Sequence, residues 1–221
     1  MERIPVYFVP GLAASHLIFE HIHLPEDKFE CVYLSWDVPK KGESLRDYAK
    51  RYCRHVVHKN PVLIGCSFGG LLVQEMKQFV DPRRIIIISS AKSYLEYPRR
   101  FRLAKATGLY KLVPVSILVN IDRFVNYKFN RWINERLKLY NKYLGVKDKS
   151  YWYWAIEKVI KWDRKTPDPD VIHVHGTADE IFPAKYIRNY IPLPGGTHIM
   201  VINRAKWLSE KLPALILDGR L

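Results

Sequence analysis

The sequence contains no long uninterrupted apolar run, and this absence bounds the class of protein. No stretch of its 221 residues approaches the roughly 20 apolar residues that a membrane-spanning helix needs. Met1-Glu2-Arg3 leads directly into a short apolar run that ends at Pro10-Gly11, without the basic segment and apolar core of a signal peptide. We therefore expect a globular protein with no transmembrane segment and no leader.

Cysteine is scarce as well. The three cysteines, Cys31, Cys53 and Cys66, are an odd number and show no metal-site spacing. Cys31 and Cys66 lie in strand-like runs, where a buried thiol is the ordinary state. Because no disulfide framework is indicated, a reduced, cytoplasmic setting is the simplest expectation.

Acidic residues are few relative to basic ones, and the imbalance is local. The formal net charge is +14, but the stretch from Leu95 to Lys165 holds 17 Lys and Arg against 6 Asp and Glu, a net of +11. No nucleic-acid-binding motif accompanies this charge, so we expect no nucleic acid partner. The length suits one domain with a small inserted unit.

Short apolar runs recur along the chain and are typical of strands buried on both faces of a parallel sheet. They are Ile4–Val9, Phe29–Leu34, Val62–Cys66, Ile85–Ser89, Val171–His175 and Tyr190–Leu193. Helical patterns fall between most of them, at Ser44–His55, Gly70–Phe79, Ala184–Asn189 and Val201–Leu212, with Pro213 as a stop signal. The alternation predicts an α/β fold with a doubly wound, mostly parallel sheet of about six strands.

A short glycine-flanked serine motif carries the strongest chemical signal. Gly65-Cys66-Ser67-Phe68-Gly69 lies between a strand pattern and a helical one. A strand that turns sharply into a helix strains its central residue, and small neighbours such as Gly65 and Gly69 make room for that turn. The helix N-terminus also directs unpaired N–H groups at the serine. We interpret Ser67 as a nucleophile, although such strings also occur by chance in turns.

Two further residues follow strand ends downstream. Asp179 lies in His175-Gly176-Thr177-Ala178-Asp179, and His198 lies in Gly195-Gly196-Thr197-His198. With its order of Ser, Asp and His, the sequence resembles the α/β-hydrolase superfamily. The likeness covers almost the whole chain outside a central insertion, and it is specific to the superfamily. The chain would lack the family's two usual N-terminal antiparallel strands.

The regular alternation of strands and helices breaks between Ser89 and Val171, a span too long for one crossover. The Leu95–Lys165 portion holds 14 of the 29 aromatic residues, among them Tyr151-Trp152-Tyr153-Trp154. The family usually places a lid at this point. Residues 92–165 are therefore expected to form a helical cap, with residues 1–91 and 166–221 as the hydrolase core.

The resemblance implies a role for each site residue. Ser67 would attack, His198 would take its proton, and Asp179 would orient the histidine. The backbone N–H groups of Phe68 and Leu12 would form the oxyanion hole, although Pro10-Gly11 stands where the family often has His-Gly. A surface-loop histidine is the alternative for His198. The alternative acids to Asp179 are Glu180, Asp168 and Asp170.

Other chemistries fit less well. His173 and His175 alternate on a strand, but they lack a third ligand at metal-site spacing, so we expect them to serve packing or to support a neighbouring site residue, and no metal is expected. Cys66 faces into the fold, which argues against a cysteine nucleophile. Because the nucleophile position holds serine and not aspartate, the resemblance does not extend to epoxide hydrolases or haloalkane dehalogenases.

The interpretation is a serine hydrolase that cleaves a carboxylic ester or thioester through an acyl-enzyme, without a cofactor. Basic residues of the predicted cap, such as Arg99, Arg100 and Arg102, would attract an anionic carrier group on the substrate, unless they form only a solvated face. Three alternatives stay open: a ligand-binding or signalling protein with weak turnover, an acyltransferase or perhydrolase, and association with a nucleic acid or anionic membrane. Acyl-chain length, leaving group and oligomeric state also stay open.

Overall fold

The computed structural model of the chain describes residues 2–120 and 131–221, except for the side chains of residues 131–134 and 136. The stretch 121–130 of the predicted cap lies outside the described residues. Among the helices that are described, none has both the length and the apolar composition needed to cross a membrane.

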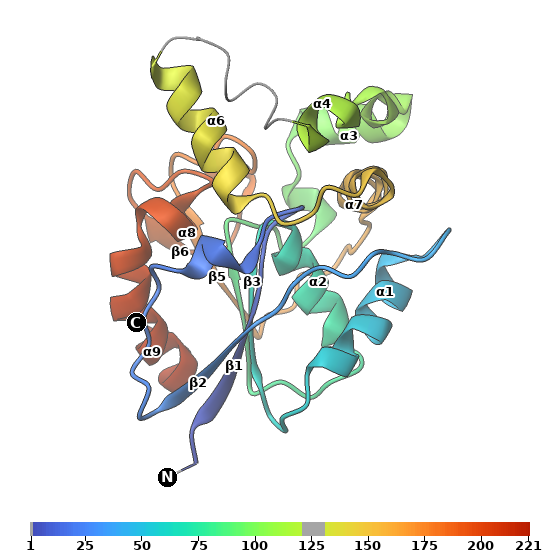
Figure 1. The fold of residues 1–221 in the computed structure, drawn as a ribbon. Helices are drawn as coiled ribbons and strands as arrows, with labels where there is room; N and C mark the ends of the chain where they lie inside the picture. The colour runs from blue at the N-terminus through green and yellow to red at the C-terminus, as the bar shows by residue number, and fades with distance from the viewer. Residues whose placement is uncertain (1, 121–130) are drawn as a thin grey trace.

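A single sheet organises the molecule (Figure 1). Its six strands are β1 (Ile4–Val9), β2 (Phe29–Tyr33), β3 (Val62–Cys66), β4 (Arg84–Ile88), β5 (Val171–Gly176) and β6 (Ile191–Leu193). The spatial order is β2-β1-β3-β4-β5-β6, and every neighbouring pair is parallel. The predicted α/β fold is confirmed, and no strand boundary differs from the expected one by more than one residue.

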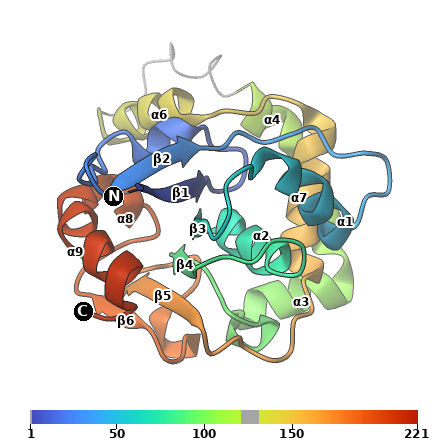
Figure 2. The same cartoon turned by 90° about the horizontal axis from the view of Figure 1, so that it is seen from below.

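Helices cover both faces of the sheet, as Figure 2 shows along the strands. They are α1 (Leu45–Tyr52), α2 (Phe68–Met76), α3 (Arg99–Thr107), α4 (Val115–Val119), α6 (Arg131–Tyr143), α7 (Lys149–Lys161), α8 (Met200–Asn203) and α9 (Ala205–Asp218). Short 3₁₀ turns are η1 (His16–Phe19), η2 (Cys53–His55), η3 (Tyr94–Glu96), η4 (Leu109–Leu112) and η5 (Ala184–Tyr186).

Alternate strand residues face two separate apolar cores. Leu63 and Ile87 pack in a cluster with residues of α1, α2 and α7. Ile64 and Ile88 pack on the opposite face in a cluster with residues of η1, α8 and α9. The continuous apolar runs of the sequence follow from this two-sided burial.

Local signals place the start of α1 correctly. Ser44 Oγ accepts a hydrogen bond of 3.0 Å from the Asp47 N–H and caps the helix, as the sequence predicts. The prediction that a helix stops before Pro213 is wrong, because α9 continues to Asp218 with Pro213 inside it. The buried stripe formed by Leu208, Leu212 and Leu215 outweighs the roughly 3 kcal/mol cost of an interior proline.

The described part of the 92–165 segment is helical and joins the core. Helices α3, α4, α6 and α7 come between β4 and β5 along the chain. Tyr151 and Trp154 of α7 contribute to the same cluster as α1 and α2. These two side chains therefore pack in the same core as the helices that cover the sheet.

Candidate active site

Ser67 occupies a sharp turn between β3 and α2. Its φ of 51° and ψ of −115° lie in a strained region for a residue with a side chain. The Ser67 N–H donates to Ile88 O at 2.9 Å, and Ser90 Oγ–H donates to Ser67 O at 2.7 Å. These two bonds to the end of β4 and the residues after it hold the turn, so Ser67 projects from the carboxyl edge of the sheet.

The two flanking glycines are required by close packing. A Cβ on Gly65 would lie 2.7 Å from Gly70 Cα and closer still to Gly69 O. A Cβ on Gly69 would lie 2.9 Å from the carbonyl carbon of Val9 and closer still to Pro10 O. The motif therefore places glycines where the turn at Ser67, called the elbow below, meets α2 and the loop after β1, called the β1 loop.

His198 lies within hydrogen-bond distance of Ser67. Its Nε2 is 3.0 Å from Ser67 Oγ, and its Nδ1 is 2.9 Å from Asp179 Oδ2. The loop after β6 reaches this position because it packs on the end of β5: Ala178 N–H donates to Gly196 O at 2.9 Å. The structure thus joins the three residues into one hydrogen-bonded chain.

Asp179 is fully buried and its carboxylate is hydrogen-bonded on both oxygens. Oδ1 accepts from the N–H groups of Ile181 at 2.8 Å and Phe182 at 2.9 Å, while Oδ2 faces His198. Burial raises the pKa of Asp179, but the hydrogen bond and charge of His198 and the Phe182 N–H more than offset it, so its pKa lies below the ordinary value.

The alternative acids lie elsewhere. Glu180 is exposed to solvent. Asp168 and Asp170 pair with Lys77 at 2.7 and 3.2 Å. Of the four acids, only Asp179 contacts His198 among the interactions of the described residues.

The loop after β1 lies beside the serine. A Cβ on Gly11, the residue before Leu12, would be 3.6 Å from Ser67 Cβ. Phe68 begins α2, and its N–H has no intrahelical acceptor. Within the described part of the chain, neither the Leu12 nor the Phe68 N–H has a protein partner. Both N–H groups are therefore free to donate to a bound ligand.

Two aromatic residues that the sequence did not single out support this loop. Trp36 Nε1–H donates to Gly11 O at 2.8 Å, and the hydroxyl of Tyr151 accepts from the Ala13 N–H at 3.3 Å. Ala13 itself has a positive φ of 55°. Trp36 follows the end of β2, a position at which a parallel sheet gathers functional side chains. Tyr151 is 138 residues from its partner, and no local pattern connects the two.

Cys66 and the histidines of β5 do not form a competing site. Burial raises the pKa of the Cys66 thiol to about 12, so the thiol stays protonated. No group of three His, Cys, Asp or Glu side chains in the described ranges is arranged to hold a metal ion.

Arg100 of α3 contacts the turn that carries the acid. Its guanidinium donates to Glu180 O and, at 2.9 Å, to Ile181 O. Arg100 was expected to act as part of a basic field, but its two hydrogen bonds give it a local partner next to Asp179.

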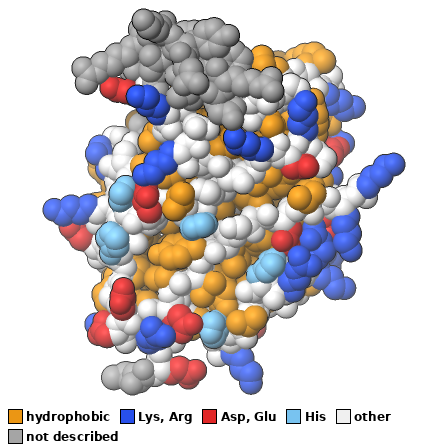
Figure 3. Space-filling view, viewed as in Figure 1, with side chains coloured by type: hydrophobic (Ala, Val, Ile, Leu, Met, Phe, Trp, Pro, Cys, Tyr) orange, Lys and Arg blue, Asp and Glu red, His pale blue; other side chains and the backbone are white. Residues whose placement is uncertain are grey.

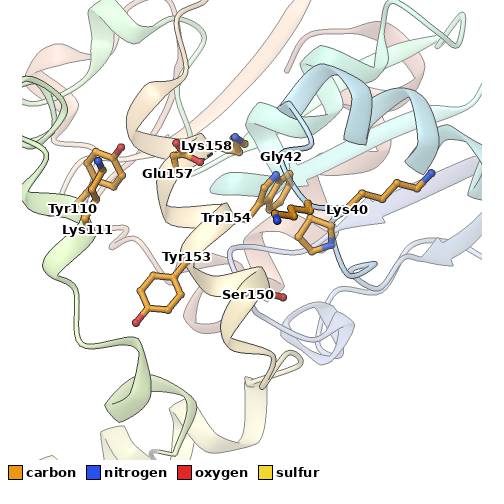
Figure 4. Close-up of a pocket in the computed structure, with 11 residues that line it drawn as sticks. Lys40, Gly42, Tyr110, Lys111, Ser150, Tyr153, Trp154, Glu157 and Lys158 are labelled. Atoms are coloured by element: carbon orange, nitrogen blue, oxygen red, sulfur yellow. Dashed lines mark hydrogen bonds and ion pairs between the residues drawn. The ribbon is translucent and has the colours of Figure 1, made fainter.

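A basic pocket of about 460 Å³ lies between the 39–42 loop, η4 and α7. Figure 4 shows Tyr110 and Lys111 on one side, Lys40 and Gly42 on the other, and α7 side chains between them. Lys40, Lys41 and Lys111 form no salt bridge within the described ranges. The space-filling view in Figure 3 shows further Lys and Arg side chains gathered over α1.

An aromatic contact links the pocket lining to the residue after the serine. Trp154 lines the pocket, and its ring meets the ring of Phe68 edge-on, with 5.8 Å between the ring centroids. Phe68 directly follows Ser67 in the chain.

Comparison with known proteins relates the whole arrangement to one family. The family model of alpha/beta hydrolases matches residues 6–210. No curated protein matches the sequence. Similar solved structures include an esterase from Thermogutta terrifontis, with a TM-score of 0.65 at 14% identity over 95% of this chain and 88% of that one.

Two other structures show the same likeness. An esterase from Exiguobacterium antarcticum superposes with a TM-score of 0.65 at 16% identity, over 96% of this chain and 91% of that one. The enol-lactonase from Burkholderia xenovorans LB400 gives 0.64 at 14% identity over the same shares. At such identities these structures establish the fold alone.

Proposed function

Because the chain belongs to the alpha/beta hydrolase family, we propose that it is a serine hydrolase that cleaves a carboxylic ester or thioester through an acyl-enzyme. The observation that carries the proposal is the hydrogen-bonded chain from Ser67 Oγ through His198 to Asp179. A strained serine at a strand end, a histidine in reach and a buried carboxylate behind it are the components that activate a hydroxyl.

The proposed acylation follows from the hydrogen bonds. A carboxylate only accepts, so His198 Nδ1 carries the hydrogen and donates it to Asp179, which leaves Nε2 free to accept. Ser67 Oγ attacks the carbonyl carbon while its proton moves to Nε2. The carbonyl oxygen becomes an oxyanion that the Phe68 and Leu12 N–H groups stabilise. When the tetrahedral intermediate collapses, the leaving alcohol or thiol takes the proton from His198.

Deacylation repeats these steps with water. His198 removes a proton from the water while the water oxygen attacks the acyl carbon. His198 then returns the proton to Ser67 Oγ as the carboxylic acid is released. Each step moves only protons and electron pairs among the groups named, so this reaction requires no cofactor.

We also propose that residues 92–165 form a cap and that the substrate has an anionic carrier group. The basic pocket supports this, since Lys40, Lys41 and Lys111 have no salt bridge in the described part of the chain, although Lys158 pairs with Glu157 at 3.1 Å. Tyr153, an exposed ring on α7, supplies a flat surface beside those lysines. A phosphate-bearing acyl thioester combines the required negative charge with a cleavable acyl bond.

The function is tested by Ser67→Ala together with a fluorophosphonate probe. The variant should fold normally, lose probe labelling and lose about 10⁴- to 10⁶-fold in kcat on a p-nitrophenyl ester panel. Hydrolysis by Ser67→Ala at the wild-type rate would exclude the proposal. A wild-type protein that binds esters but does not label would instead support the binding protein.

A second pair of variants tests the acid. Asp179→Asn should reduce kcat far more than Glu180→Gln, because only the residue that contacts His198 fixes its tautomer. The opposite ranking would assign the role to Glu180.

A further inference from the structure

Two buried histidines lie near Asp179 and take no part in the proposed acylation and deacylation. His173 and His175 are alternate residues of β5, and their exposures are 1% and 0%. His173 Nε2 is 3.1 Å from His175 Nδ1, and His175 Nε2 is 2.8 Å from Phe182 O. Tyr190 packs its ring against both.

The hydrogens of this pair can be assigned from its partners. Phe182 O can only accept, so His175 Nε2 carries a hydrogen and donates it. In a neutral His175, Nδ1 then accepts, so His173 Nε2 is the donor to it. His173 Nδ1, which then carries a lone pair, has no hydrogen-bond partner in the described structure. His173 Nε2–H thus points to His175, and His175 Nε2–H points to the 179–182 turn.

Burial favours the neutral form of both histidines despite their charged surroundings. Burial is the main cause that lowers the pKa of His173, and His175 and Lys92 add to it. Burial also lowers the pKa of His175, and the opposing effects of Phe182 O and Asp179 do not overcome it. In the neutral form of His175, the contact of 3.8 Å between its Nε2 and Asp179 Oδ2 brings an N–H group close to the carboxylate.

His175 and the Asp179 carboxylate share a hydrogen-bond partner, Phe182. Phe182 accepts from His175 through its carbonyl and donates to Asp179 Oδ1 through its N–H. A shift of Phe182 would therefore move the carboxylate, and with it the plane of His198. We infer that His175 is a positioning residue that fixes the 179–182 turn through Phe182 O, and that His173 holds the His175 ring in place through the hydrogen bond to its Nδ1. This inference rests on the proposed function.

Two amides of different length separate a hydrogen-bonding role from a packing role. In His175→Gln, the amide nitrogen can occupy the place of Nε2 and still donate to Phe182 O. In His175→Asn, the amide nitrogen falls near the place of Nδ1 and cannot reach it. We expect the Asn variant to lose about 10- to 100-fold in kcat with KM little changed, and the Gln variant to retain most of its activity.

A double-mutant cycle identifies the route of the effect. If His175 acts through Asp179, His175→Asn in an Asp179→Asn background should reduce kcat little further. A packing defect would reduce kcat by the same factor in both backgrounds. Thermal unfolding of each variant, followed by circular dichroism, shows whether the folded state is comparable.

Equal kcat values for folded His175→Gln and His175→Asn would overturn the inference, as would full additivity in the cycle. If the His175 variants do not fold, His173→Gln and His173→Asn provide the same comparison one step further from the acid. Failure of the proposed function would show itself differently, as hydrolysis that survives Ser67→Ala.

Discussion

At the scale of single residues, Ser67 holds a backbone conformation that its neighbours must tolerate. The carbonyls of Gly69 and Pro10 occupy the places where side chains on Gly65 and Gly69 would begin. Gly11 differs, because a Cβ there would meet Ser67 Cβ at an ordinary 3.6 Å. An added methyl group would therefore overlap backbone atoms at Gly65 and Gly69 but not at Gly11.

We predict that Gly65→Ala and Gly69→Ala each lower the free energy of unfolding by about 3 kcal/mol, because backbone must move to relieve the overlap. Gly11→Ala, the matched control, should change it by less than about 1 kcal/mol. Urea unfolding of the three variants measures this. Similar losses for all three would mean that the elbow's close packing is not what the glycines serve.

Asp179 links the site to the pH dependence of stability. Its pKa is lower in the folded chain than the ordinary value of about 3.9 expected when unfolded. Its contribution is therefore fully present above about pH 4 and is lost as the pH falls through the folded pKa. We predict that wild type loses more unfolding free energy than Asp179→Asn between pH 5 and the acid transition, in urea titrations. A parallel decline would refute this.

Local signals identify some site residues and not others. Ser67, Asp179 and His198 stand in short motifs after strand ends, so their meeting follows from the parallel sheet. Tyr151 was assigned only to a predicted cap, and His175 was expected to serve packing or to support a neighbouring site residue. Their roles depend on hydrogen bonds with Ala13 and Phe182 that only the folded chain brings into place.

At the scale of elements, α3 is joined to the acid turn. Arg100 donates to two successive carbonyls directly after Asp179, whereas its neighbour Arg99, which is also exposed, has no hydrogen bond or ion pair in the described structure. Helical pattern and charge predicted a basic helix here, yet charge alone does not distinguish a guanidinium with a carbonyl partner from one in water.

Arg100→Met should therefore lower kcat by roughly 5-fold on a neutral p-nitrophenyl ester, because an exposed hydrogen bond contributes about 1 kcal/mol. Arg99→Met serves as the control with the same change in charge. Steady-state kinetics at a single ionic strength provide the comparison. Equal effects of the two variants would assign the loss to charge and not to the contact with the acid turn.

At the scale of the whole molecule, positive charge is unevenly distributed. The pocket between the 39–42 loop, η4 and α7 presents lysines without salt bridges in the described structure, whereas Arg51 of α1 pairs with Glu43 at 2.8 Å. The sequence predicted a basic surface on the proposed cap. It could not predict that part of this surface comes from Lys40 and Lys41, which precede α1 and are far from the cap in the chain.

If this field attracts an anionic substrate, kcat/KM for a phosphate-bearing acyl thioester should fall steeply as salt rises to about 0.2 M, where screening acts within roughly 8 Å. A neutral ester of the same acyl length should change little. Lys40→Glu, Lys41→Glu and Lys111→Glu should lower kcat/KM for the thioester relative to kcat/KM for the neutral ester. The same salt dependence for both substrates would leave these lysines as a solvated face.

The link between the β1 loop and the residues after α6 has a consequence for how such a chain can be cut and recombined. Ala13 O accepts from the N–H groups of Gly145 at 2.8 Å and Val146 at 3.1 Å, Leu144 bridges to Ala14, and Tyr151 accepts from the Ala13 N–H. A chimaera that exchanges residues 92–165 for another protein's segment would therefore remove the support of the loop that carries Leu12. The unit of exchange is the segment together with its stretch of the β1 loop, and a crossover placed at the strand ends alone would yield a folded sheet with a misplaced donor.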